Sequence, residues 1–400
     1  MSAPLRIALV VPHMFMHRGL LPQVIFSPGH LALSLAHELQ EQGAAVTLFT
    51  PGPVDTAVPQ ITADLSLFQA ELDRRGDTYL SLLKKHPFTF ITIARQVQGE
   101  LVADAYARAN ADEFDLVHVY CNEEELALSF ASLCRKPVVF THHDPYNLMV
   151  KYKSIMPRYK HLNWVSFSHA QRAGMPADTN WLATIPHGLT TPISSCARSD
   201  LAQTYVAYMG RIIEAKGVHL AIAAVRAYNK TAEQPLRLKI AGKHYSDSEK
   251  HSYWQTRIAP ELDDMVEYVG FIDTTEAKHD FLSHAAALLM PSIFDEPFGM
   301  TAIEALACGT PVIALESGAL PEIISHGTTG YIAKKVFTAS GSGDKPTLNE
   351  TKTAHHLQIA LAKWAEVDRT ACRTAYETRF TTQRMAKDYL AVYQSLTSNL

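Results

Sequence analysis

The sequence predicts an α/β protein built from two domains, each with a doubly wound parallel sheet. Short apolar, β-branched segments alternate with helical segments along the chain, which is the pattern of parallel βαβ units. The alternation stops at residues 186–200, where Thr, Pro, Ser and Gly accumulate, and then resumes. A chain of 400 residues is also longer than one ordinary hydrophobic core accommodates.

The first half begins with an apolar strand at residues 6–11, followed by a long loop. A helix is expected at 30–42, because leucines recur there at helical spacing and Gly43 ends the run. After a strand at 45–50, residues 62–110 are expected to be mainly helical. Further short strands are expected at 116–120, 137–141, 164–168 and 181–185.

The second half repeats this alternation without repeating the sequence. We expect domains at 1–195 and 196–378. Parallel sheets of this kind bind ligands at the carboxyl ends of their strands. The expected strands are 205–209, 236–241, 266–270, 286–290, 311–314 and 330–333, and the expected helices include 218–229 and 275–283.

Composition excludes several classes of protein. Hydrophobic residues make up 47% and charged residues 19%, as in soluble globular proteins. The formal net charge of −4 argues against a nucleic-acid partner, which demands a basic excess. No apolar run is long enough to span a bilayer, and no signal peptide is recognised. Five scattered cysteines without a Cys-x-x-Cys pair fit a reducing cytoplasm.

The most informative segment is Phe294-Asp-Glu-Pro-Phe-Gly-Met-Thr-Ala-Ile-Glu-Ala-Leu-Ala-Cys-Gly-Thr-Pro311. Its short turn predicts a helix with Pro297 in the first turn, where the missing N–H costs nothing. The backbone N–H groups of Phe298, Gly299 and Met300 would then face an anion such as a pyrophosphate. Glu296 and Glu304 flank this point, so they are expected to hold the sugar and ribose hydroxyls of a nucleotide-sugar.

A second motif, Tyr208-Met-Gly-Arg-Ile-Ile-Glu-Ala-Lys-Gly217, follows an expected strand and precedes an expected helix. Gly210 allows a sharp turn, and Arg211 and Lys216 can both reach one pyrophosphate, whose charge they would neutralise. An ordinary strand–helix turn with two solvated cations would have the same residues. Beside the Glu296–Glu304 segment, we favour the functional interpretation.

Two histidines and an aspartate follow the strand expected at 137–141. His143 is expected to hydrogen-bond a sugar hydroxyl, with Asp144 fixing its orientation. The alternative is that His142 and His143 cap the strand by bonding to backbone. A metal site is disfavoured because adjacent histidines on a strand point to opposite faces. His118, in an expected strand, is interpreted as structural.

The stretch from Lys151 to Lys160 is basic, aromatic and free of acids. It suggests weak peripheral contact of residues 151–160 with an anionic membrane surface or with an acidic acceptor. A solvated helix face is the competing and favoured interpretation. Cys308 lies in an apolar helix and is expected to be core.

These motifs resemble retaining family 4 glycosyltransferases of the GT-B fold, also called glycosyl transferases group 1. Glu-Pro-Phe-Gly, Gly-Arg…Lys-Gly and the terminal Arg379-Phe-Thr-Thr-Gln-Arg occur in the family's order and spacing. The resemblance covers most of the second half and, more patchily, the first. It implies two Rossmann-like domains facing each other across a cleft, with a final helix at 379–400 that crosses back to the first domain.

The resemblance also implies roles for single residues. Glu296 would bind the donor sugar and Glu304 the ribose, while Arg211 and Lys216 would hold the diphosphate. His143 would contact the sugar from the first domain. The family places paired glycines after the first strand, whereas this loop offers only Gly19 and, just beyond it, Gly29. Either Gly19 or the turn at residues 27–29 approaches the donor phosphate, or the acceptor side is organised differently.

The function expected from these residues is retaining transfer of a sugar from a nucleoside diphosphate, with UDP favoured, to a sugar, lipid-linked or small-molecule acceptor. No cofactor and no metal are expected, because the cations can neutralise the leaving phosphate. Two alternatives remain open, which are a nonhydrolysing sugar-nucleotide epimerase and a non-enzymatic nucleotide-sugar sensor.

Overall fold

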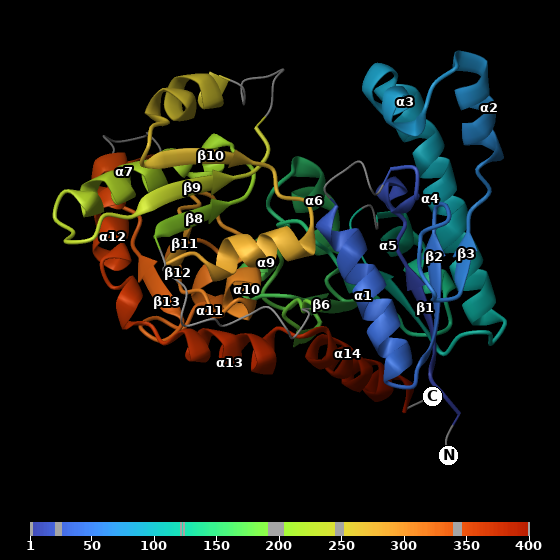
Figure 1. Ribbon diagram of the computed structural model, residues 1–400. Helices are drawn as coiled ribbons and strands as arrows, with labels where there is room; N and C mark the ends of the chain where they lie inside the picture. Colours follow the sequence, from blue (N-terminus) through green and yellow to red (C-terminus); the bar gives the residue numbers. More distant parts are fainter. Residues whose placement is uncertain are drawn as a thin grey trace. The chain divides into compact units, whose positions relative to one another are not determined.

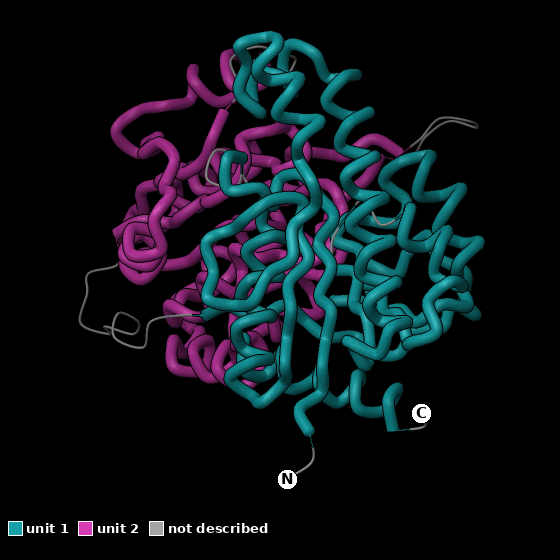
Figure 2. The backbone as a smooth tube through the Cα atoms, turned by 90° about the vertical axis from the view of Figure 1, so that its right-hand side faces the viewer, with its two compact units in different colours: residues 1–190, 382–400 teal, residues 191–381 magenta. Residues whose placement is uncertain are grey.

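The chain divides into two compact units (Figure 2). Unit 1 comprises Met1–Thr190 and Thr382–Leu400, and unit 2 comprises Thr191–Thr381. The predicted domain boundary between residues 195 and 196 lies outside the described residues. The structure, a computed structural model, describes residues 3–20, 26–120, 122, 125–190, 204–244, 252–338 and 346–398.

Unit 1 is built on a seven-stranded parallel sheet with the order β3-β2-β1-β4-β5-β6-β7. The order reverses between β1 and β4, and the carboxyl edge beside such a pair is where doubly wound sheets bind ligands. The strands are β1 (Arg6–Val10), β2 (Ala45–Thr50), β3 (Gln60–Thr62), β4 (Leu116–Tyr120), β5 (Val138–Thr141), β6 (Asn163–Ser166) and β7 (Trp181–Thr184).

The central strands of unit 1 are buried on both faces. Ala8 and Val10 of β1 join the core that includes Leu101 and Val102 of the long helix α4. Ile7 and Leu9 alternate with them, point to the opposite face, and are equally inaccessible to solvent. Burial on two faces explains why these strands are continuous apolar runs rather than alternating ones.

The helices of unit 1 include the C-terminal one, α14, which runs beside α1 (Figure 1). The side-chain amide of Gln42, just after α1, donates to the carbonyl of Gln383 in α14 at 2.9 Å. The helices are α1 (Ser27–Glu41), α2 (Ser66–Arg75), α3 (Tyr79–Lys85), α4 (Pro87–Asn110), α5 (Glu125–Phe130), α6 (Val150–Ile155) and α14 (Thr382–Thr397).

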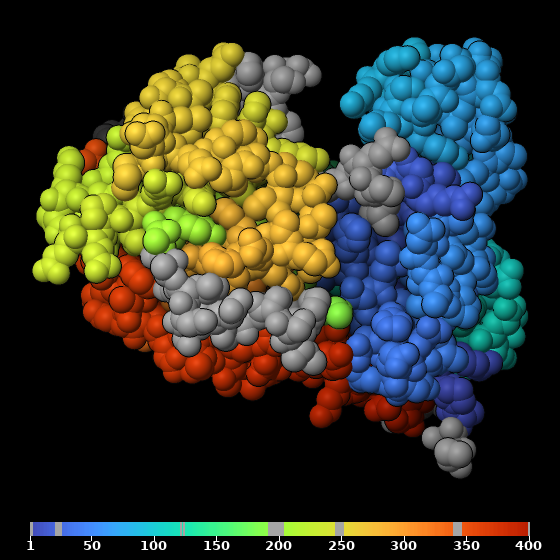
Figure 3. Space-filling model, in the orientation of Figure 1, coloured from blue at the N-terminus to red at the C-terminus, as the bar shows by residue number. Residues whose placement is uncertain are grey.

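Helices α2 and α3 form a lobe at one end of unit 1 (Figure 3). The lobe has a small core of its own, in which Phe68, Leu72 and Leu82 pack with Phe90 of α4. Helix α1 begins at Ser27, three residues earlier than predicted, so the segment 27–29 is a first helical turn with Pro at a favoured position.

The chain leaves unit 1 after Thr190 and returns to it at Thr382. The hydroxyls of these two residues lie 3.2 Å apart, and the N–H of Thr382 donates to the carbonyl of Leu189 at 3.3 Å. The two ends of the excursion through unit 2 are therefore hydrogen-bonded to each other within unit 1.

Unit 2 is a second doubly wound sheet, with six parallel strands in the order β10-β9-β8-β11-β12-β13. Its order reverses between β8 and β11. The strands are β8 (Tyr205–Met209), β9 (Arg237–Ala241), β10 (Val266–Gly270), β11 (Ala287–Met290), β12 (Val312–Leu315) and β13 (Gly330–Ala333). The helices are α7 (Val218–Asn229), α9 (Thr275–Ser283), α10 (Met300–Ala307), α11 (Leu320–Ile323), α12 (Glu350–Leu361) and α13 (Arg369–Arg379).

A short antiparallel ribbon of β14 (Phe337–Thr338) and β15 (Thr347–Leu348) completes unit 2. Cys308, at the end of α10, is fully buried, which confirms its predicted place in the core. The prediction of two α/β domains with parallel sheets is confirmed. No helix within the described ranges is both long and apolar enough to cross a membrane.

Candidate functional site

The two strongest sequence motifs meet at the point where the strand order of unit 2 reverses. The loop carrying Gly210, Arg211 and Lys216 follows β8, and the loop carrying Glu296 follows β11. These strands are neighbours in the sheet. Their carboxyl ends therefore place both motifs at the edge where a doubly wound sheet binds its ligand.

Lys216 and Glu296 form an ion pair at this edge. The Nζ atom of Lys216 lies 2.5 Å from Oε1 of Glu296, and their side chains are 19% and 6% exposed. The hydroxyl of Ser292 donates to the same Oε1 atom at 2.5 Å. Both bonds use Oε1, and Oε2 of Glu296 makes no hydrogen bond to another residue within the described parts of the chain.

Gly217 holds the two loops in register. Its φ of +68° is in the left-handed region, and a Cβ atom there would lie 2.1 Å from the carbonyl oxygen of Pro291. The N–H of Ile293 also donates to the carbonyl of Ala215 at 2.8 Å. The backbone of one loop thus packs directly on the other, which fixes Lys216 beside Glu296.

Helix α10 begins at Met300, so the prediction that Pro297 lies in its first turn is wrong. Gly299 precedes the helix with a φ of +135°, and a Cβ atom there would lie 2.8 Å from Leu320. The Pro-Phe-Gly segment is a non-helical bend before the helix, with Phe298 buried. The first free N–H groups of α10 therefore start at Met300.

Glu304 lies on α10 with the ammonium of Lys278 at 3.3 Å from its Oε1 atom. Burial raises the pKa of Glu304 above its ordinary value, although the charge of Lys278 acts in the opposite direction. The negative charge of Glu304 is therefore less well stabilised than that of a carboxylate in water. Perturbed carboxylates of this kind are common in binding sites.

Arg211 is exposed, and its guanidinium has no hydrogen bond or ion pair to other described residues. Its carbonyl accepts from the hydroxyl of Tyr208 at 2.8 Å, which anchors the turn after β8. Beside it, a Cβ atom on Gly242 would lie 1.8 Å from the carbonyl oxygen of Gly210, so the backbones of two neighbouring loops are in contact.

In unit 1, His143 lies just beyond β5 and is buried. Its ring is stacked on that of His187, with centroids 5.1 Å apart and planes 2° from parallel. Burial, followed by the charges of nearby histidines, lowers the pKa of His143 well below its ordinary value. Its Nε2 atom is buried and has no hydrogen-bond partner among the described residues, so the neutral ring has one unsatisfied nitrogen.

Asp144 acts on His143 through an intermediary. Asn122 donates to Oδ2 of Asp144 at 2.8 Å and accepts from the backbone N–H of His143 at 3.1 Å. The hydroxyl of Tyr152 also donates to Asp144, at 3.2 Å. The aspartate therefore orients the backbone of His143 rather than its ring.

His118 is structural, as predicted. It is fully buried, and its two ring nitrogens bond to the hydroxyls of Tyr393 at 2.7 Å and Thr141 at 2.9 Å. Thr141 in turn bonds to the hydroxyl of Tyr389 at 3.2 Å. This network ties α14 to β4 and β5, and burial lowers the pKa of His118 to about 3.

The loop after β1 is organised by its own histidines. His17 accepts from the N–H of Gly19 at 2.9 Å, and His13 accepts from the N–H of Phe15 at 3.2 Å. The backbone donor of Gly19 is thus already used, which leaves the predicted phosphate approach at Gly19 without that N–H.

Two lysines of the basic stretch 151–160 are paired with acids from elsewhere in unit 1. Lys151 lies 2.5 Å from Glu125, and Lys160 pairs with Asp178. Tyr152 and Met156 from the same stretch are buried. The surface of this stretch therefore carries less uncompensated positive charge than its sequence suggests.

Ser292 and Lys278 are site residues that the sequence did not single out. Ser292 stands four residues before Glu296 and shares its Oε1 atom. Lys278 comes from α9, and nothing in its spacing relative to Glu304 signals the contact. Within the described ranges, no three or more His, Cys, Asp or Glu side chains are grouped so as to hold a metal ion.

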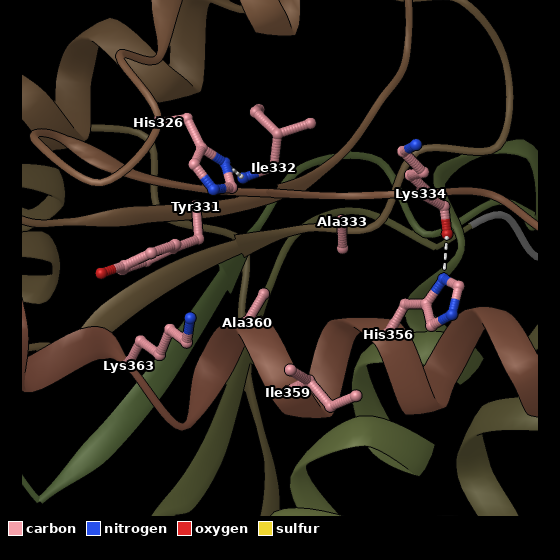
Figure 4. A pocket seen from close by; sticks show the side chains of 9 residues that line it. All are labelled: His326, Tyr331, Ile332, Ala333, Lys334, His356, Ile359, Ala360 and Lys363. Carbon is pink, nitrogen blue, oxygen red and sulfur yellow. Dashed lines mark hydrogen bonds between the residues drawn. The ribbon is translucent and has the colours of Figure 1, made fainter.

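Away from these residues, unit 2 has a hollow of about 240 Å³ between β13 and α12 (Figure 4). His326 accepts from the N–H of Ile332 at 3.1 Å, and His356 donates to the carbonyl of Lys334 at 3.0 Å. None of the predicted site residues lines it. With both histidines bonded to backbone, we assign this hollow no role in the site.

Residues 197–340 match the protein family described as glycosyl transferases group 1. Unit 2 contains a glycosyl transferases group 1 domain. The predicted resemblance is confirmed, and the Lys216–Glu296 pair and Glu304 lie within the matched residues of this group 1 domain.

Among curated relatives, D-inositol 3-phosphate glycosyltransferase of Pseudarthrobacter chlorophenolicus is 32% identical over 152 residues. That match covers 38% of this chain and only 36% of the relative's length.

Solved structures of glycosyltransferases share the fold over nearly the whole chain. Sucrose-phosphate synthase of Thermosynechococcus elongatus is 20% identical with a TM-score of 0.68, over 99% of this chain and 100% of that one. HepE of Anabaena, solved in complex with UDP and glucose, is 16% identical with a TM-score of 0.64, over 98% of this chain and 100% of that one. The GT-B fold class predicted for this chain is confirmed.

Proposed function

We propose that the protein is a retaining glycosyltransferase that moves a sugar from a nucleoside diphosphate, with UDP favoured, to an acceptor hydroxyl. The observation that carries the proposal is the ion pair between Lys216 and the buried Glu296 at the strand-order reversal of a group 1 domain. The UDP preference is supported by the UDP-bound neighbour of the same fold.

In the proposed site, Lys216 gains a second partner when the donor binds. Its ammonium shares Oε1 of Glu296 with Ser292, so a diphosphate oxygen can take one of its remaining N–H donors. Arg211, which is exposed in the same loop, adds a second positive charge. The N–H groups at the start of α10 provide further donors to the phosphate.

The two glutamates then hold the ends of the donor. Oε2 of Glu296 accepts from a hydroxyl of the sugar, and Glu304 accepts from a ribose hydroxyl. The neutral His143 of unit 1 bonds a sugar hydroxyl through Nε2, the atom without a protein partner. These assignments make the glutamates binding groups rather than an acid and base pair.

The proposed reaction balances without a nucleophile from the protein. The bond between the anomeric carbon and the diphosphate oxygen breaks as the acceptor oxygen bonds to the same face of that carbon. The proton of the acceptor hydroxyl moves to the leaving phosphate oxygen, and a nucleoside diphosphate is released. Lys216 and Arg211 stabilise the charge that develops on this leaving group, so no metal is required.

Thermal unfolding with UDP, GDP or ADP tests donor binding, because a ligand of the folded state raises the midpoint by mass action. Labelled sugar nucleotides, incubated with and without a panel of acceptors, then test transfer. We expect UDP to raise the midpoint most and label to appear only in the acceptor. Isomerised donor without an acceptor would indicate an epimerase, and binding without turnover would indicate a sensor.

A further inference from the structure

Lys278 of α9 is a cation that lies outside the sequence motifs and yet contacts one of the two glutamates of the site. Its Nζ atom is 3.3 Å from Oε1 of Glu304, and Glu304 is its only ion-pair partner among the described residues. The two side chains are 33% and 19% exposed. Because they belong to different helices, the contact depends on how α9 packs on α10.

Helix α9 is fixed beside α10 at its C-terminal end. Leu282, one turn after Lys278 on the same face, is fully buried. The hydroxyl of Thr310, just beyond α10, donates to the carbonyl of Leu282 at 2.7 Å. Arg369 of α13 donates to the carbonyl of Ser283 at 2.8 Å. The ammonium of Lys278 is therefore presented to α10 by a helix that is itself held in place.

The carboxylate of Glu304 depends on this ammonium. Burial raises the pKa of Glu304, and the charge of Lys278 acts in the opposite direction. The ammonium binds Oε1, whereas Oε2 makes no hydrogen bond to another residue within the described ranges. Lys278 therefore stabilises the ionised form of Glu304 and leaves one of its two oxygens open.

Other charged groups surround α10, on the helices that pack against it. Arg369 and Arg373 of α13 donate to the backbone carbonyls of Ser283 and Ala307. The charge that acts on the pKa of Glu304 is that of Lys278. The remaining charged or titratable groups on these helices are Glu276, His279 and Asp280 of α9, Glu322 of α11, and Glu377 of α13.

We propose that Lys278 is a positioning residue for the donor nucleotide, which binds Oε1 of Glu304 and thereby holds this carboxylate ready for a ribose hydroxyl. The inference rests on the proposed function, in which Glu304 accepts from the ribose. Each donor carboxylate then has a lysine of its own, with Lys216 beside Glu296 and Lys278 beside Glu304. Lys216 also reaches the diphosphate, whereas Lys278 acts on the nucleotide only through Glu304.

Titration calorimetry with UDP and with 2′,3′-dideoxy-UDP tests the inference, because only UDP has ribose hydroxyls for Glu304. The GDP or ADP pair is used instead if that nucleotide binds more tightly. Lys278→Met should weaken UDP about tenfold at about pH 6, the equivalent of one charged hydrogen bond. It should leave the binding of dideoxy-UDP unchanged.

Two matched variants serve as controls for the loss of the lysine. Lys278→Arg retains the positive charge and should restore most of the affinity for UDP. Lys352→Met removes an exposed lysine of α12 that makes no ion pair with another described residue, and it should affect neither ligand. In the background of Glu304→Gln, Lys278→Met should cause no further loss of UDP binding.

The pH dependence of UDP binding separates support of a carboxylate from a purely structural role. The affinity falls where Glu304 gains a proton, because the protonated acid is a poorer acceptor. Loss of the ammonium raises the pKa of Glu304 further, so this fall should begin about one pH unit higher in Lys278→Met. Most of the lost affinity should return at higher pH. Titration of the diphosphate is common to both proteins and is measured with dideoxy-UDP.

Equal weakening of UDP and dideoxy-UDP by Lys278→Met would overturn the inference, because the lysine would then act on the nucleotide directly. A loss of the same size at every pH would also overturn it. If UDP binds the unmodified protein and Lys278→Met binds it equally well, this inference fails while the proposed function stands. No binding of UDP, GDP or ADP by the unmodified protein would contradict the proposed function, and this inference with it.

Discussion

Glu296 and Glu304 have the same side chain and opposite surroundings. Glu296 receives an ammonium and a hydroxyl on one oxygen, and its side chain is 6% exposed. Glu304 has a cation at 3.3 Å and a pKa raised by burial. The first carboxylate is therefore stabilised by its neighbours in the absence of ligand, and the second is strained by its environment. Their removal is expected to have different effects on stability.

Lys216→Met should abolish most turnover and destabilise the protein. It removes the cation from a nearly buried carboxylate, which costs about 3–5 kcal/mol when a buried pair is broken. Chemical unfolding and the rate of donor consumption measure the two effects. The double variant Lys216→Met with Glu296→Gln should regain stability but not activity, and near-normal turnover in either variant would exclude Lys216 from the reaction.

Glu304→Gln should raise the unfolding midpoint of the ligand-free protein and weaken UDP. The neutral amide removes the cost of a desolvated carboxylate, and it is a poorer acceptor for a ribose hydroxyl. We expect about tenfold weaker UDP binding, which corresponds to one charged hydrogen bond. A midpoint that falls, or UDP binding that is unchanged, would contradict the ribose assignment.

At the scale of elements, the site depends on two loops whose backbones touch. Gly217 makes this contact, because the carbonyl of Pro291 occupies the space of a side chain. Gly76, after α2, has almost the same backbone conformation, with φ of +66° against +68°, and nothing lies within 4 Å of its virtual Cβ atom. The two glycines thus share conformational strain and differ only in packing.

Gly217→Ala is therefore expected to be much more damaging than Gly76→Ala. Both alanines incur about 1–2 kcal/mol for the left-handed conformation, and only the first must displace the loop that carries Glu296. The free energy of unfolding and the UDP-dependent midpoint shift measure the difference. Equal losses would show that the loops do not need their close contact.

The sequence predicted the elements well because their signals are local. The strand 205–209 and the helices 218–229 and 275–283 have the predicted bounds, since the spacing of apolar residues marks them and Gly210 follows the strand. The start of α10 was misplaced, because Pro297 suits a first helical turn but Gly299 is the residue next to the helix. The contact of Lys278 with Glu304 was not predictable, since it joins two helices through tertiary packing.

At the scale of the whole molecule, buried neutral histidines are concentrated in unit 1. Burial lowers the pKa of His118 and of His187 to about 3, and that of His13 to about 4. Each folded pKa lies below the unfolded value of about 6.5, so the unfolded chain binds more protons below that pH. The contribution of these histidines to the free energy of unfolding is fully present above pH 6.5. It is lost as the pH falls toward their pKa values in the folded protein.

The expected slope is about 1.4 kcal/mol per pH unit for each such histidine. Between pH 6.5 and 5 most carboxylates remain ionised, so the loss there belongs to histidines. His187→Phe, beside Phe167, should reduce the slope of the unfolding free energy by about one proton's worth. His355→Phe, at an exposed position of α12, is the control. An unchanged slope in the first variant would contradict the assignment.

Unit 2 has the topology of a domain inserted into unit 1. Thr190 and Thr382, which flank the insertion, are hydrogen-bonded to each other. Joining these two residues directly would excise residues 191–381 and leave a continuous chain with both ends of the cut already adjacent. Such a miniaturised protein would retain the seven-stranded sheet and the α14 network in a single polypeptide. Unit 2 could therefore be exchanged for another domain at these two positions without a change to the sequence of unit 1.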